Sequence, residues 1–222
     1  MDSATEERAS RTLLAVRILV VAAITIACLR IAWLSDDALN TLRSALNLTH
    51  GWGPGFNATE SVQAYTHPLW FLLWAGVGAI TDQWILGVLA VSLVFSALAV
   101  GILAWSTRSI PRLILVVFLL VLSNSFIEYS TSGLENPLSY FIVAVLMAIS
   151  LRGHSARVPQ WFYALITGLT VAALLLTRLD LVMLVIPVGI YGIQRFHRHW
   201  LLLLIGVMSA LFPLLVWFAW SK

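Results

Sequence analysis

Long uncharged stretches of Leu, Val, Ala and Ile alternate with short polar connections along the whole 222-residue chain. A helix needs about 20 apolar residues, at a rise of about 1.5 Å each, to cross the hydrocarbon core of a bilayer. Seven stretches approach that length, although several are short for a full crossing. They are residues 13–34, 84–105, 111–127, 137–151, 160–177, 180–194 and 200–220. The pattern predicts an all-α fold, a polytopic transmembrane helix bundle.

The segments between residues 34 and 84 follow a different pattern. Residues 69–80 are apolar but reach only about half the length of a crossing, which predicts a half-helix at the outer face. Residues 35–68 form the only long polar connection, interpreted as an external loop. Its first part predicts an interfacial amphipathic helix, because apolar residues recur there at helical spacing. The apolar face comprises Ala38, Leu39, Leu42, Ala45 and Leu46, and the polar face comprises Asp37, Asn40, Thr41 and Ser44.

The composition indicates that lipid covers much of this chain. Hydrophobic residues make up 60% of it and charged residues only 10%, against roughly 25% charged residues in an ordinary soluble domain. We therefore interpret residues 1–222 as a single transmembrane domain. The single cysteine, Cys28, excludes an intrachain disulfide and a cysteine metal site.

The positive charges indicate a topology rather than nucleic-acid binding. The net charge is +3, but the basic residues occur as four short pairs between apolar stretches, and such pairs are typical of the cytoplasmic side of a membrane. If all four pairs are cytoplasmic, the apolar segments must cross the membrane in twos between them, so residues 69–80 do not cross it. This topology predicts a multi-pass plasma-membrane protein with a cytoplasmic N-terminus. The pairs are Arg8 with Arg11, Arg108 with Arg112, Arg152 with Arg157, and Arg195 with Arg198.

The same topology brings the remaining polar groups together on the non-cytoplasmic side. These groups lie at residues 36–37, 128–136 and 178–180. The topology therefore predicts one external cavity lined by Asp37, Glu135 and Arg178.

Asp36 and Asp37 follow a membrane helix directly, where an ionised carboxylate is costly unless it is solvated, paired or bound to a metal. Either carboxylate could act as a general base that removes a proton from an attacking hydroxyl. The alternative is structural, because acidic residues stabilise the first turn of a helix. Asn136 and Pro137 form a helix start signal that leaves Glu135 unexplained. Asp37 and Glu135 are the candidates for a divalent metal site, which stays open.

Three arginines predicted near the external face could bind an anionic phosphate: Arg30, Arg43 and Arg178. Arg30 lies seven residues before Asp37, so a continuous helix would place both on one face. Snorkelling, or pairing of Arg178 with Asp180, is the structural alternative.

The external loop also carries histidine and aromatic residues. His67 precedes Pro68 at the start of an apolar segment and could shuttle a proton, although a loop histidine is more often a polar surface residue. The aromatic residues are typical of an interfacial belt. They are Trp52, Tyr65, Trp70 and Trp74.

In this order, the motifs resemble the first external loop of GT-C membrane glycosyltransferases. Within that superfamily they are most similar to the actinobacterial arabinofuranosyltransferase B type, over roughly residues 30 to 140. The shared stretches are Asp36-Asp37-Ala38, Gly51 to Asn57, Glu60 to Gln63, Tyr65 to Trp70, and Thr131-Ser132-Gly133-Leu134-Glu135-Asn136.

The resemblance implies a GT-C-like fold and inverting transfer of a sugar from a polyprenyl-phosphate donor to a cell-envelope glycan acceptor on the non-cytoplasmic face. Arabinofuranose is the donor sugar if the closest likeness holds. Asp37 or Asp36 is then the catalytic base. The expected substrate-binding residues are Arg30, Arg43, His67, Glu135, Asn136, Arg178 and Asp180.

Members of that family continue through more membrane helices and usually an external soluble domain. The chain is therefore expected to be a fragment, a module that depends on a partner, or a truncated inactive relative. A non-catalytic lipid-binding or transport module is the other open hypothesis, and it predicts polar residues through the whole depth of the bundle.

Overall fold

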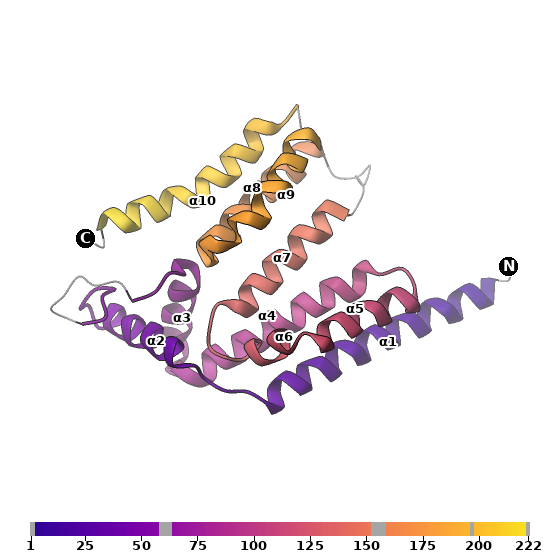
Figure 1. Cartoon of the computed structure of the whole chain (residues 1–222), viewed down its shortest axis with the longest axis horizontal. Helices are drawn as coiled ribbons and strands as arrows, with labels where there is room; N and C mark the ends of the chain where they lie inside the picture. Colours follow the sequence, from indigo (N-terminus) through magenta and orange to yellow (C-terminus); the bar gives the residue numbers. More distant parts are fainter. Residues whose placement is uncertain (1–2, 58–63, 152–158, 196–197, 221–222) are drawn as a thin grey trace.

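The computed structural model of the protein describes residues 3–57, 64–151, 159–195 and 198–220. Within these ranges the secondary structure is helical, without a strand. The predicted fold class, an all-α membrane bundle, is confirmed (Figure 1). The elements are α1 (Ser3–Arg30), α2 (Asp36–Thr49), α3 (Pro68–Thr81), α4 (Trp84–Ser106), α5 (Ile110–Leu122), α6 (Asn124–Tyr129), α7 (Asn136–Leu151), α8 (Gln160–Thr177), the 3-10 turn η1 (Leu179–Leu181), α9 (Val182–Arg195) and α10 (Trp200–Trp220).

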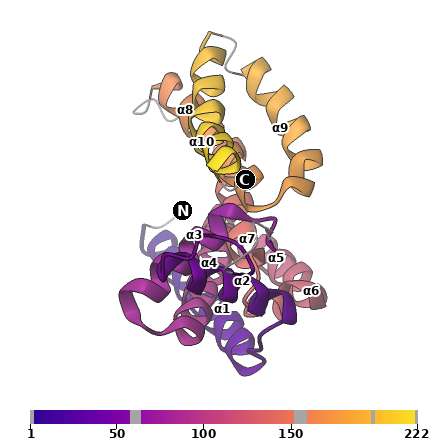
Figure 2. The same ribbon diagram turned by 90° about the vertical axis from the view of Figure 1, so that its left-hand side faces the viewer.

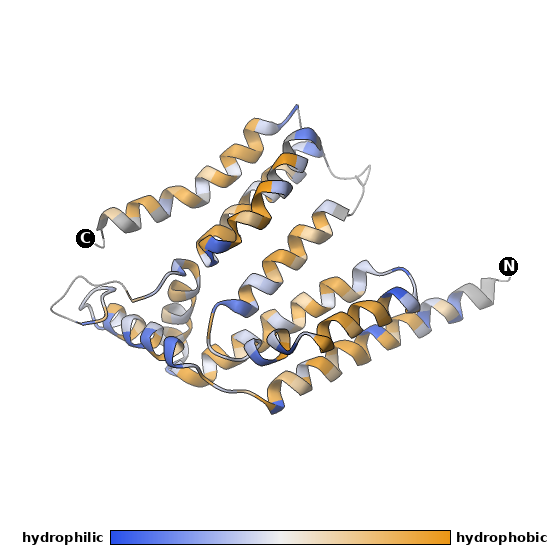
Figure 3. Cartoon of the chain, viewed as in Figure 1, coloured by the Kyte–Doolittle hydropathy of each residue, from blue (hydrophilic) through white to orange (hydrophobic). Residues whose placement is uncertain are grey.

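Three of the described helices are long and apolar enough to cross a membrane: Glu7–Arg30 within α1, Trp84–Ser106 and Gln160–Thr177. Four shorter helices are apolar but fall below that length. They are Pro68–Thr81, Ile110–Leu122, Asn136–Ser150 and Trp200–Pro213. Figure 3 shows hydrophobic residues along the helices, with hydrophilic residues concentrated in α2 and near helix ends.

The helix order places unlike polar segments at opposite ends of the bundle. Figure 1 shows the N terminus and the α4–α5 connection at one end. It shows α2, the start of α7 and the end of α8 at the other. The short helix α3 runs across this second end, at an angle to α4 (Figure 1). That residues 69–80 do not cross the membrane stays a prediction.

The boundaries differ from the prediction in two places where a serine begins a helix. The first helix ends at Arg30 instead of residue 34, and Ser35 caps α2 by accepting a hydrogen bond from the Ala38 N–H at 3.2 Å. The stretch 111–127 is broken at Ser123, whose side chain accepts from the Phe126 N–H and starts α6. The serine hydroxyls satisfy N–H groups that the first helical turn leaves unpaired, which makes a new start favourable.

The α2 helix forms as predicted but buries a different face. Thr41 and Ser44 are buried, together with Ala38 and Ala45, whereas Leu39 is 46% exposed. Small side chains thus allow α2 to pack closely on α3, and an assigned polar face becomes an internal one.

The main core also corrects the expected aromatic belt. Trp70 and Trp74 are fully buried and Tyr65 is 4% exposed, so of the four aromatic residues only Trp52 is strongly exposed. Both tryptophans pack with residues of α7 and α8, including Ile142. This core fixes α3, whose first turn borders the polar residues described below.

The α8 and α10 helices cross at two glycines. A Cβ atom at Gly168 would lie 2.2 Å from the Leu203 carbonyl oxygen, and one at Gly206 would lie 2.6 Å from the Leu165 carbonyl oxygen. Small residues at a helix crossing allow this close approach, which is a common means of association in membranes. Figure 2 shows α10 beside α8, with α9 apart from this pair.

Candidate functional site

A tight loop before α7 is fastened to both α2 and α3. The Ser35 N–H donates to the Ser132 carbonyl at 3.0 Å, and the Trp70 indole N–H donates to the Gly133 carbonyl at 2.9 Å. Gly133 has φ +77°, in the region that favours glycine. A Cβ atom there would also lie 2.9 Å from the Ala38 Cβ. These contacts hold the start of α7 against the start of α2.

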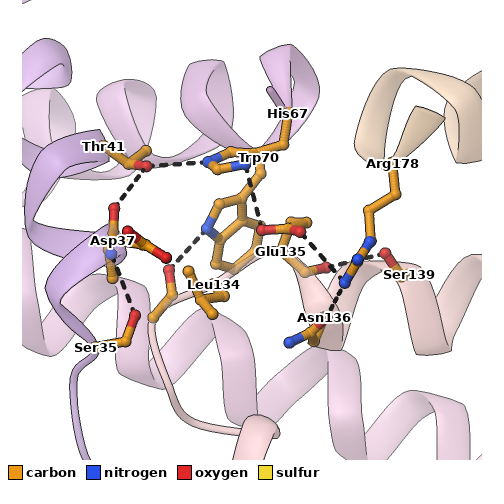
Figure 4. Close-up of polar contacts among 12 residues, drawn as sticks. Ser35, Asp37, Thr41, His67, Trp70, Leu134, Glu135, Asn136, Ser139 and Arg178 are labelled. Atoms are coloured by element: carbon orange, nitrogen blue, oxygen red, sulfur yellow. Dashed lines mark hydrogen bonds and ion pairs between the residues drawn. The ribbon is translucent and has the colours of Figure 1, made fainter. Parts of the chain in front are cut away.

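A chain of buried polar side chains links α2, α3 and α7 (Figure 4). The Thr41 hydroxyl lies 3.0 Å from His67 Nε2, and His67 Nδ1 lies 3.3 Å from a carboxylate oxygen of Glu135. His67 and Glu135 are only 7% and 8% exposed. With the proton on Nδ1, the imidazole donates to Glu135 and accepts from Thr41, so both ring nitrogens have protein partners.

Burial lowers the pKa of His67 below its ordinary value of 6.5. The Glu135 carboxylate opposes this shift, Arg178 reinforces it, and Asp37 opposes it. The imidazole is therefore neutral at neutral pH, and its contact with Glu135 is a hydrogen bond rather than a full ion pair. Because both ring nitrogens have partners inside the protein, the imidazole holds Thr41 and Glu135 in place, and its role as a proton shuttle stays a prediction.

The lowered pKa of His67 makes the folded protein sensitive to acid. The unfolded chain takes up a proton at His67 below pH 6.5 more readily than the folded protein does. We expect the stability contribution of neutral His67 to be complete above that pH and to decline as the pH falls further. Thermal unfolding in detergent between about pH 8 and pH 5 measures this slope. His67→Gln should flatten it, and an unchanged slope in that variant would assign the acid sensitivity to other groups.

Arg178 follows α8 and joins it to the start of α7. Its guanidinium donates to the Asn136 side-chain oxygen at 2.9 Å and lies 3.6 Å from a carboxylate oxygen of Glu135. Two further bonds, of 3.0 and 2.8 Å, hold Asp180 in a fork. This fork raises the pKa of Arg178 and lowers the pKa of Asp180. The predicted structural pairing of Arg178 with Asp180 is thus present.

We call these residues the Glu135 cluster. It comprises Thr41, His67, Glu135, Asn136, Arg178 and Asp180, from four parts of the fold. It unites five of the expected substrate-binding residues, whose roles stay predictions. Sequence reasoning missed Thr41, because it was assigned to the polar face of α2, and it missed the tethers at Ser35 and Trp70. The glycine within Thr-Ser-Gly-Leu-Glu was a usable signal for the tight loop.

Asp37 borders the cluster from the first turn of α2, and Asp36 lies beside it. Both are exposed. Within the described ranges the Asp37 carboxylate has no hydrogen bond or ion pair, although its charge acts on His67. Figure 4 shows Asp37 in the same view as Thr41, Glu135 and Arg178. The carboxylate is therefore accessible to a bound ligand.

Two of the expected phosphate-binding arginines do not join the cluster. Arg30 is the last residue of α1 and is exposed, because the chain leaves the helix before Ser35 and no continuous helix connects it to Asp37. Arg43 instead donates to Asn57 at 3.1 Å and lies 4.3 Å above the Phe56 ring. Arg43 thus holds the glycine-rich loop against α2, and of the three arginines only Arg178 lies at the cluster.

A cavity of about 240 Å³ adjoins Asn136 and Arg178. Apolar residues line most of it, including Leu120, Phe126 and Met147. Neither Asp37 nor Glu135 lines this cavity. The cavity shared by Asp37, Glu135 and Arg178 stays a prediction, with Glu135 enclosed by its partners and Asp37 exposed on α2.

The sequence predicted Asp37 and Glu135 as candidate ligands of a divalent metal. In the part of the chain that the structure describes, no group of three or more His, Cys, Asp or Glu residues is arranged to hold a metal ion. Residues 60–63 of the resembling motif, and the basic pair Arg152 and Arg157, lie outside the described residues.

Comparison with known proteins gives a partial similarity. The chain is 32% identical over 120 residues to a terminal beta-(1->2)-arabinofuranosyltransferase of Corynebacterium glutamicum. The match covers 51% of this chain and 18% of that protein, so the chain spans less than a fifth of its relative. No family model and no solved structure matches. The similarity supports a relation to a glycosyltransferase family.

Proposed function

We propose that the protein is a membrane glycosyltransferase, or the part of one, that moves a sugar from a polyprenyl-phosphate donor to a glycan acceptor. The observation that carries the proposal is the convergence of Asp37 with the Glu135 cluster at one end of the bundle. The partial similarity to an arabinofuranosyltransferase makes arabinofuranose the first donor sugar to test.

In this proposal Asp37 is the general base of an inverting reaction. The carboxylate accepts the proton of an acceptor hydroxyl, whose oxygen forms a bond to the anomeric carbon of the donor sugar. The bond between that carbon and the phosphate oxygen breaks, and polyprenyl phosphate leaves with the bonding electrons. Exposure and the absence of a described hydrogen-bond partner suit Asp37 to this role.

Arg178 is the proposed contact for the donor phosphate. The site combines three carboxylates with one guanidinium, that of Arg178, which leaves a formal charge of −2. This charge repels an anion. The carboxylates are those of Asp37, Glu135 and Asp180. Asp180 is 62% exposed and binds the same guanidinium edge that a phosphate would use. We therefore expect the phosphate to take the place of Asp180 on Arg178, with the first isoprenoid carbons in the adjoining 240 Å³ cavity.

Glu135 is the proposed acceptor of hydrogen bonds from a donor-sugar hydroxyl. His67 and Arg178 hold its carboxylate at 3.3 and 3.6 Å, so the group is oriented before a substrate arrives. Such preorganisation lowers the cost of ordering a bound ligand.

Binding and transfer test the proposal separately. Purified protein is heated with polyprenyl-phosphate arabinofuranose, with polyprenyl phosphate alone and with the free sugar. We expect the intact donor to raise the melting temperature by about 4 °C more than either part, since bound ligand stabilises the folded state. Membranes containing the chain should transfer labelled sugar to a glycan acceptor, and membranes lacking it should not. Protection without transfer favours the inactive relative or the lipid-binding module. The absence of both protection and transfer rejects the proposal.

A further inference from the structure

A second cavity, of about 840 Å³, lies between four helices and away from the Glu135 cluster, and we call it the groove. It is lined by residues of the second halves of α4 and α7, together with single residues of α1 and α8. Its lining residues are apolar apart from Trp105 and Tyr163, and its volume is in the range of about 300–1,000 Å³ that holds small ligands. Its lining residues include Val21, Gly101, Trp105, Ile149 and Tyr163.

Positive charge gathers where this groove ends. The Arg17 guanidinium lies 5.9 Å from the centre of the Trp105 ring and donates to the Thr107 carbonyl at the end of α4. Arg108 follows directly and Arg112 lies in the first turn of α5, both exposed. Neither forms an ion pair within the described residues. The carboxylates of the Glu135 cluster belong to the opposite end of the bundle.

We infer that this groove binds one acyl chain of an anionic phospholipid, whose phosphate lies beside Arg17, Arg108 and Arg112. The apolar groove buries the acyl chain of the lipid. The arginines, which have no carboxylate partners, attract the anionic headgroup. Trp105 and Tyr163 supply the aromatic rim that suits the boundary between chain and headgroup. The donor sugar reacts at the other end, so the inference is independent of the proposed function.

The glycines allow a sharp test of the groove. A Cβ atom at Gly101 would meet no atom within 4 Å, so Gly101→Leu fills the groove without a collision at its first carbon. Gly76 in α3 is equally open and does not line the groove, which makes Gly76→Leu the matched control. Arg17→Gln removes, of the three positive charges beside the groove, the one nearest Trp105. Arg11→Gln removes one from the same helix at a residue paired with Glu7.

The full chain in detergent is melted with palmitoyl-oleoyl phosphatidylglycerol or with phosphatidylcholine, and bound lipid is counted by native mass spectrometry. We expect phosphatidylglycerol to raise the melting temperature by about 4 °C more than phosphatidylcholine, with one lipid retained. Gly101→Leu and Arg17→Gln should each remove this difference, and both controls should keep it.

Four outcomes would overturn the inference. Equal stabilisation by the two lipids would exclude headgroup recognition, and retention of phosphatidylglycerol by Gly101→Leu would place the lipid elsewhere. Loss of a dimer in Gly101→Leu would make a second copy of the chain the occupant. Displacement of phosphatidylglycerol by polyprenyl phosphate would assign the groove to the donor lipid.

Discussion

Asp37→Asn is expected to lower sugar transfer by about 10²–10⁴-fold, the usual contribution of a general base. Asparagine has nearly the same shape but accepts no proton at neutral pH. The backbone carbonyl of Asp37, which lies 3.3 Å from the Thr41 hydroxyl, is unchanged. Initial rates at saturating donor, measured in membranes with matched protein amounts, give the comparison.

Asp36→Asn is the matched control for this experiment. Asp36 and Asp37 both lie in the first turn of α2 and are exposed, so each variant loses a similar favourable interaction with the helix dipole, typically about 0.3–1 kcal/mol. Only Asp37 acts on the His67 pKa. We expect Asp36→Asn to keep transfer within a few-fold of wild type. Equal activity of Asp37→Asn and wild type would remove Asp37 from the mechanism.

Gly133→Ala is expected to destabilise the fold by about 3 kcal/mol. A left-handed backbone costs a non-glycine residue about 1–2 kcal/mol, and overpacking adds about 1–3 kcal/mol. The new Cβ would lie 2.4 Å from the Leu34 Cδ1 and 2.9 Å from the Ala38 Cβ. Denaturant or thermal unfolding in detergent measures the loss.

Gly76→Ala is the control for this change. Gly76 lies within α3, and a Cβ atom there meets nothing within 4 Å. Because alanine favours a helix over glycine by about 1 kcal/mol, this variant should be as stable as wild type or slightly more stable. The same loss in both variants would mean that the loop before α7 does not depend on its glycine.

The sequence was sufficient to predict the helices because their apolar stretches are long. It also placed residues near positions 37, 135 and 178 at one end of the bundle, because the arginine pairs restrict the topology. The helix start at Ser123 was missed, since an apolar stretch conceals a local side-chain cap. A cap depends on one hydrogen bond, and hydropathy over a long window averages it away.

The details of the site were less predictable. Partner choice among charged side chains depends on rotamers and on distances of a few ångströms, so the sequence left pairing and phosphate binding open for Arg178. The guanidinium of Arg43 is a chemically suitable phosphate ligand, yet it is hydrogen-bonded to Asn57 and stacked over the Phe56 ring. The burial of Thr41 required knowledge of how closely α2 approaches α3.

The glycine crossing of α8 and α10 bears on chemistry far from it. Arg178 directly follows α8, and the contacts at Gly168 and Gly206 restrict how that helix can slide along its neighbour. A displacement by one helical turn, about 5.4 Å, would withdraw the guanidinium from Asn136 and Glu135 together. The compensation of the Glu135 charge by Arg178 therefore depends on the axial position of α8, which is fixed at Gly168, more than two turns away.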